Sequence, residues 1–185
     1  MATIARRSDN AADLPYSASQ IVNSLKVLNS TDEIEDVLDG VETLRRMEDE
    51  LGEIPGFRNQ LLASLASNNA SDVKGAALTL RKVQGDAGLQ DRIRRSLANG
   101  RMADPKKGGG FEVRETLELD DQEWVRIVDL KVPDPDADDE VIERFEFKGN
   151  RTSFRMGKTQ RHQFRGDVLQ FARNEGEPRW VLHKD

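Results

Sequence analysis

The residues with the clearest chemical potential form a basic segment that also carries aromatic side chains. Arginines and lysines recur every three or four residues between positions 144 and 165, with phenylalanines between them. Such a segment can follow a phosphate backbone, because each cation neutralises a phosphate while an aromatic ring stacks on a base. The candidate binding strip consists of Arg144, Lys148, Arg151, Arg155, Lys158, Arg161, Arg165, Phe154 and Phe164.

Cross-strand ion pairing gives the same residues a purely structural role. In an antiparallel sheet the cations would face acidic residues on neighbouring strands, while the phenylalanines would fill the core. The acidic residues available for such pairs are Glu112, Glu115, Glu118, Glu123 and Glu143. An anionic protein partner is a third interpretation. Since the chain has 28 basic and 34 acidic residues, its net charge of −6 disfavours a polyanion at long range.

Patterns typical of catalysis or metal binding are incomplete. Residues 157–159 resemble the end of a phosphate-binding loop, but Thr152 stands where that loop requires glycine. Asp134, Asp136 and Asp138 have the spacing of a calcium loop without its glycine and its final glutamate. The chain has no cysteine and only 2 histidines. We therefore expect no enzymatic activity, no cofactor and no metal, and the sequence indicates no small-molecule substrate.

The first hundred residues carry the apolar spacing of amphipathic helices. The clearest helix is predicted over 32–51, with Ser30 and Glu33 forming a capping box and Gly52 ending the helix. Further helices are predicted over residues 17–28, 57–66, 72–83 and 89–98. Because each is too short to be stable alone in water, we expect them to pack together as a helical bundle or a stack of helical hairpins.

A weak internal similarity appears when the sequence is offset by 40 residues. Within it, residues 61–80 resemble one helical hairpin of the armadillo or HEAT type, with a Ser-Asp pair opening the second helix. Two ordinary amphipathic hairpins with similar caps explain the same pattern, and we favour that interpretation.

From Phe111 onward the apolar residues alternate with polar ones, which is typical of strands with one buried face. Residues 133–139 are predicted to form a loop, Gly149 and Asn150 a hairpin turn, and residues 168–173 and 179–183 a last hairpin. We thus predict an α+β fold with a helical module over 1–102, a flexible linker over 103–110 and a β module over 111–185. The β module is expected to be a mostly antiparallel six-stranded meander or small barrel.

Charge is unevenly distributed along the β module. Residues 104–146 contain 15 acidic and 6 basic residues, whereas residues 147–185 contain 9 basic and 4 acidic ones. We interpret the chain as a non-enzymatic structural or assembly protein that bridges subunits of a larger complex, for example in a phage or virus particle. It would act through protein partners or self-association. The alternative is a nucleic-acid-binding subunit that uses the strip at residues 144–165.

The sequence also bears on location. The N-terminal region lacks the apolar run of a secretory signal, and no segment approaches the roughly 18 apolar residues that span a bilayer. We therefore expect the protein in the cytoplasm, or in a particle assembled there, without a membrane partner.

Overall fold

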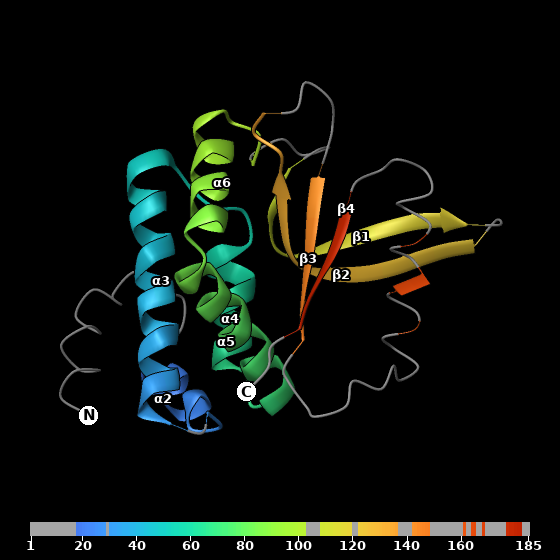
Figure 1. Cartoon of the computed structure of the whole chain (residues 1–185). Helices are drawn as coiled ribbons and strands as arrows, with labels where there is room; N and C mark the ends of the chain where they lie inside the picture. The colour runs from blue at the N-terminus through green and yellow to red at the C-terminus, as the bar shows by residue number, and fades with distance from the viewer. Residues whose placement is uncertain are drawn as a thin grey trace.

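The computed structural model describes residues 18–28, 30–102, 108–119, 122–136, 142–148 and 177–182, together with Arg161, Phe164, Arg165 and Val168. Helices form the N-terminal part and strands the C-terminal part (Figure 1). The helices are α2 (Ala18–Leu25), α3 (Thr31–Leu51), the π-helical turn η2 (Phe57–Leu61), α4 (Leu62–Ala66), α5 (Ala70–Gly85) and α6 (Ala87–Ala98). The strands are β1 (Gly110–Leu119), β2 (Gln122–Pro133), β3 (Ile142–Lys148) and β4 (Glu177–Leu182).

Helix α3 confirms the helix predicted over 32–51, and its caps explain where it begins and ends. The Ser30 hydroxyl oxygen accepts a hydrogen bond from the backbone N–H of Glu33 at 3.2 Å. This bond satisfies one of the amide groups that a helix leaves unpaired at its first turn. At the other end Gly52 adopts a φ of 111° and donates its N–H to the Glu48 carbonyl at 2.8 Å. A residue with a side chain would be strained in that conformation.

Gly40 allows α3 and α5 to approach at backbone distance. A Cβ atom on Gly40 would lie 2.7 Å from the carbonyl oxygen of Leu80 and 2.9 Å from its Cβ atom. Leu80 and its neighbours across the contact, Val37 and Leu44, are fully buried. The two longest helices therefore meet over an apolar face that depends on a missing side chain.

The prediction of a six-stranded meander or small barrel is wrong. In the described part of the chain only β1, β2 and β3 form an antiparallel sheet, in that order. Strand β4 joins the edge of β3 in the parallel direction, with Phe145 opposite Arg179. The chain still combines helices with a mostly antiparallel sheet, but it does so with fewer strands and with one crossover.

The predicted strands between β3 and β4 fail at the four residues that the structure describes there, which are helical. Arg161, Phe164, Arg165 and Val168 are helical, and their three- and four-residue spacing places them on one face. Val168 therefore does not open a hairpin. The connection from Lys148 to Glu177 is long enough for a crossover, which a parallel strand pair requires. The predicted turn at Gly149 and Asn150 lies outside the described residues.

Glycines at the start of β1 serve close packing rather than flexibility. Gly109 and Gly110 are buried. A Cβ atom on Gly109 would lie 2.5 Å from the Lys131 carbonyl oxygen, and one on Gly110 would lie 2.6 Å from the Pro55 carbonyl oxygen. The adjacent Phe111 donates its backbone N–H to Pro55 O at 3.1 Å. This end of the predicted linker is therefore built into the contact between the helices and the sheet.

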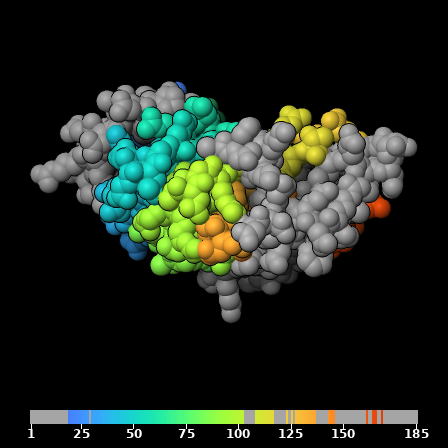
Figure 2. Space-filling view, turned by 90° about the horizontal axis from the view of Figure 1, so that it is seen from above, coloured from blue at the N-terminus to red at the C-terminus, as the bar shows by residue number. Residues whose placement is uncertain are grey.

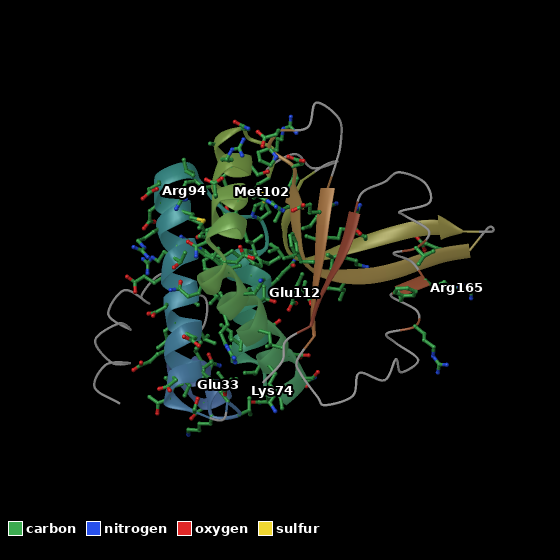
Figure 3. All side chains as sticks on the ribbon, in the orientation of Figure 1. Glu33, Lys74, Arg94, Met102, Glu112 and Arg165 are labelled. Atoms are coloured by element: carbon green, nitrogen blue, oxygen red, sulfur yellow. The ribbon has the colours of Figure 1, made fainter. Side chains whose placement is uncertain are left out.

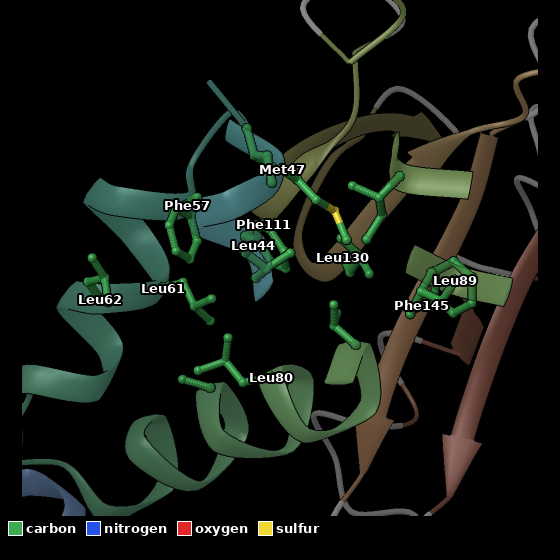
Figure 4. Close-up of a cluster of buried hydrophobic side chains, with 14 of the residues drawn as sticks. Leu44, Met47, Phe57, Leu61, Leu62, Leu80, Leu89, Phe111, Leu130 and Phe145 are labelled. Carbon is green, nitrogen blue, oxygen red and sulfur yellow. The ribbon is translucent and has the colours of Figure 1, made fainter. Parts of the chain in front are cut away.

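One hydrophobic core joins the helices to the sheet (Figure 4). Phe111, Leu130 and Phe145 from the strands belong to the same buried cluster as the leucines of the helices. The rings of Phe57 and Phe111 lie with centroids 6.1 Å apart at an interplanar angle of 54°. Such tilted aromatic pairs stabilise a core beyond the area they bury. The two parts of the chain thus stabilise each other through shared apolar contacts.

Candidate interaction surface

Three charged side chains, one each from β1, β2 and β3, are buried together. The Glu115 carboxylate accepts hydrogen bonds from the Nε atom of Arg144 at 3.0 and 3.1 Å, and its Oε1 atom lies 3.0 Å from the Nζ atom of Lys131. All three residues are less than a tenth exposed. The ion triad, as we call Glu115, Lys131 and Arg144, therefore places two cations around one carboxylate away from bulk water.

The ion triad requires a sharply coiled sheet. Lys131 and Arg144 are direct partners across β2 and β3, but Glu115 pairs in register with Arg126, five residues back along β2. In a flat sheet this offset would separate the groups by about 17 Å. Within β1, Glu112 has a φ of 45°, in the left-handed region that side chains disfavour. The β1–β2 ribbon curves strongly along its length (Figure 1), and Glu115 reaches the β2–β3 pair.

Electrostatics in the ion triad favour the charged form of Glu115. Burial by itself would raise the pKa of this carboxyl group, because it disfavours the ion. Attraction and hydrogen bonding from Arg144, and then from Lys131, outweigh burial and lower the pKa from 4.5 to about 2. Glu115 is thus a carboxylate at all ordinary pH values.

Glu112 has the opposite shift for a related reason. Its side chain is half-buried between the helices and the sheet (Figure 3) and accepts a hydrogen bond from the Ser64 hydroxyl at 2.8 Å. Burial raises the pKa of this carboxyl group, and the Ser64 hydrogen bond opposes that effect only in part. The hydrogen bond attaches the strained turn of β1 to helix α4.

Side chains of α6 and of the residues just after it hold the loop that follows β2. The Ser96 hydroxyl donates to the Pro133 carbonyl at 3.0 Å, and Arg101 donates to the Asp134 carbonyl at 2.6 Å. Arg95 forms an ion pair with Asp136 at the same place. The predicted loop over 133–139 is therefore docked on a helix as far as its described residues reach. Asp138, the third aspartate of the calcium-like spacing, is not among them.

The candidate binding strip is only partly described. Arg144 is buried in the ion triad, so its guanidinium faces Glu115. Arg161 and Arg165 are exposed on the helical segment after β3, and the Phe164 side chain between them is 45% exposed. Lys148 ends β3, but its side chain is not described. Arg151, Phe154, Arg155 and Lys158 lie outside the described residues, so the strip as a whole stays a prediction.

A projecting pair of strands carries exposed apolar residues that the sequence interpretation did not single out. We call residues 113–119 of β1 and 122–128 of β2 the arm; it points away from the helices (Figure 1). Its outer face consists of Arg114, Thr116, Glu123, Val125 and Ile127, all of them exposed. Val125 is 37% exposed and Ile127 52% exposed. The alternation of residue types along β2 could have indicated two faces, but it does not show which face the rest of the protein covers.

The surface view agrees with this placement. The described residues of β1, in yellow, lie at the surface on the side of the molecule away from α3 (Figure 2). On the opposite face of the arm Val128 is fully buried and Glu115 belongs to the ion triad. The arm therefore has one face closed by the protein itself and one face that presents two apolar residues between charged ones.

The described residues contain neither a cluster of metal ligands nor a membrane-spanning helix. Among the described side chains, no group of three or more histidines, aspartates or glutamates is arranged to hold a metal ion. Both histidines of the chain, His162 and His183, fall in stretches that the structure does not describe. Over those same described stretches, none of the helices combines the length and apolar character needed to cross a bilayer.

Comparison with known proteins adds no identification. No protein-family model matches the chain, and no curated protein and no solved structure resembles it at a significant level.

Proposed function

We propose that this protein is a non-enzymatic assembly protein that joins subunits of a larger complex through the outer face of the arm. One observation carries the proposal: Val125 and Ile127, with exposures of 37% and 52%, lie next to each other on a projecting pair of strands. Single exposed apolar residues are common, but apolar residues grouped on a projection and bordered by polar ones are typical of protein contact sites. Charged residues at both ends of the group would orient a partner.

The way the arm is attached supports the same proposal. The ion triad connects the arm to β2 and β3, and the Ser64 hydroxyl connects the start of β1 to the helices. A binding surface on a fixed element loses little conformational entropy when a partner docks. The charged groups of the triad are directed at one another, so we assign them to holding the arm. We expect the protein to act in the cytoplasm or in a particle assembled there, such as that of a phage or virus.

Site-specific photo-crosslinking tests the proposal. A benzophenone amino acid replaces Ile127 in the full chain, expressed in the cells that naturally produce the protein, and Arg94 on α6 is replaced in a control. Arg94 is exposed but lies on the helical body (Figure 3). We expect position 127 to give covalent adducts with protein chains and position 94 to give none.

Two results would count against the proposal. Equal crosslinking from positions 127 and 94, or none from position 127, would remove the arm as the contact surface. Adducts that disappear after nuclease treatment would instead favour the nucleic-acid alternative, in which the exposed residues Arg161, Phe164 and Arg165 contribute to binding.

A further inference from the structure

We infer that Glu112 is a pH-sensitive switch at the base of the arm. While its carboxyl group is protonated, the start of β1 stays packed against the helices. When the group is ionised, that packing loosens and the arm moves more freely relative to the helical body. The inference concerns how the arm is held, and it applies whatever partner the arm binds. It is carried by the backbone of Glu112, by the hydrogen bonds around it and by the charges that face it.

The backbone of Glu112 is strained. Its φ of 45° is the one positive value among the described residues other than glycine. Such a conformation is unfavourable for a residue with a side chain, and it persists only where the surrounding structure holds it. If those contacts weaken, the backbone can relax toward an ordinary extended conformation. Glu112 is therefore a point at which the direction of the arm can change.

Three contacts from the helical part hold this strained segment in place. The Phe111 N–H donates to the Pro55 carbonyl at 3.1 Å, and Gln60, with its amide oriented to satisfy both groups, donates to the carbonyl oxygens of Phe111 and Glu112. The Ser64 hydroxyl donates to Oε1 of Glu112 at 2.8 Å (Figure 3). Of the three, only the Ser64 contact involves the group that titrates. A protonated carboxyl group still has an oxygen that accepts this hydrogen bond.

Acidic groups face Glu112 from both sides. The register of the strand pairs on either side places Asp129 of β2 opposite Glu112. Asp72, in the first turn of α5, acts on it from the helical side. Like charges opposite each other destabilise a strand pair. Over the part of the chain that the structure describes, these two carboxylates are the charged groups that act on Glu112. Its ionised form is therefore repelled by the sheet and by the helices together.

The direction of the switch follows from these surroundings. Burial, and then the Asp129 and Asp72 charges, raise the pKa of Glu112 above 4.5, although the Ser64 hydrogen bond opposes them in part. The packed form thus binds the proton more tightly than a loosened form, in which the side chain meets water. The stabilisation is complete below about pH 4.5 and is lost as the pH rises through the raised pKa. Glu115 stays ionised over this range because its pKa is about 2, so the ion triad does not contribute to the change.

A distance measurement on the purified full chain tests the inference. Because the chain has no cysteine, spin labels can be attached to two introduced ones, Ile127→Cys on the arm and Arg94→Cys on α6. Pulsed electron paramagnetic resonance then gives the distribution of label distances between about pH 4.5 and about pH 8. We expect a narrow distribution at the acidic end and a broader one at the alkaline end. The same distribution at both ends would overturn the inference.

Charge-removing variants of the labelled chain assign the transition to Glu112. Glu112→Gln keeps an oxygen that accepts from Ser64 and cannot ionise, so its distribution should stay narrow at every pH. Asp72→Asn removes one repelling charge and should move the transition to lower pH, and it tests the inference even if Glu112→Gln fails to fold. Asp32→Asn is the matched control, because Asp32 is also an exposed aspartate in the first turn of a long helix. It should leave the transition where it is.

A transition that persists in Glu112→Gln, or that Asp72→Asn and Asp32→Asn move equally, would assign the pH dependence to another group and refute the inference. The proposed function can survive that result. Crosslinks from position 127 together with an arm that does not respond to pH would retain the contact surface and reject the switch. A pH-dependent arm without crosslinks would do the reverse.

Discussion

At the scale of single residues, the ion triad shows how a charged sheet can be stable without being a ligand site. Two cations surround Glu115, so removal of the carboxylate would leave Lys131 and Arg144 buried without a counter-charge. Removing one member of such a network lowers the free energy of unfolding strongly, because the remaining charges stay buried without a partner. An intact network, by contrast, stabilises the fold little compared with an apolar core. Sequence reasoning included Glu115 among the acids that might pair with Arg144, but the participation of Lys131 depends on the curvature of the sheet.

We predict that Glu115→Gln lowers the free energy of unfolding by about 3 kcal/mol. The amide keeps the shape of the side chain and removes its charge, so the loss reports on the unpaired cations. Urea denaturation measures the change. Glu123→Gln is the matched control, since Glu123 is an exposed residue of the outer face, and it should change stability by less than about 0.5 kcal/mol.

The pH dependence of the same pair provides a second readout. Because the pKa of Glu115 falls from 4.5 to about 2 on folding, the unfolded chain binds this proton more tightly than the folded one. The stabilisation is therefore complete above about pH 4.5 and is lost as the pH falls toward 2. The difference between wild type and Glu115→Gln should shrink over that interval. A constant difference would show that the carboxylate charge is not what stabilises the triad.

At the scale of elements, close approach of backbones decides how the helices and the sheet fit together. Gly40 permits the contact between α3 and α5, Gly109 permits close approach to the backbone of Lys131 in β2, and Gly110 permits the contact of β1 with Pro55 in the helical part. In each case a side chain would collide with backbone atoms, which cannot move aside as the end of a flexible side chain can. Glycine has a structural role at these three positions that its usual association with flexible linkers does not suggest.

Replacement of two helical glycines by alanine should have opposite effects. Gly40→Ala should lower the free energy of unfolding by about 1 to 3 kcal/mol, because the new methyl group meets the Leu80 backbone. Gly75→Ala in α5 meets no atom within 4 Å and should raise it by about 0.5 to 1 kcal/mol, the usual gain in a helix. Denaturant titrations of both variants measure these changes. An increase in the free energy of unfolding for both variants would mean that α3 and α5 are not in backbone contact.

At the scale of the whole molecule, one core makes the predicted helical and β modules depend on each other. Phe111 at the start of β1 is fully buried and contacts Phe57 of the helical part. On the other side, Arg92 of α6 pairs with Glu143 in β3, and Arg101, just beyond the end of α6, donates to the Asp134 carbonyl after β2. Apolar and polar contacts therefore both extend across the boundary between the modules.

We predict a single cooperative unfolding transition for the full chain. Far-UV circular dichroism follows the helices, and tryptophan fluorescence follows the sheet, because Trp124 lies in β2 and Trp180 in β4. The two probes should give the same midpoint, and Phe111→Ala should shift both together by about 3 to 5 kcal/mol in stability. Separate midpoints, or a shift seen only by fluorescence, would show that the two modules fold independently.

The sequence by itself determined the features that short-range physics controls. The capping box at Ser30, the apolar stripe of α3 and the alternation that begins at Phe111 each involve residues a few positions apart, so their elements follow from local spacing. Tertiary structure alone decided that β4 runs parallel to β3, that Lys131 and Arg144 meet Glu115, and that the apolar side chains of Val125 and Ile127 remain uncovered. These features depend on a long crossover and on the curvature of the sheet. Neither leaves a periodic trace in the chain, because both arise from contacts between residues far apart in sequence.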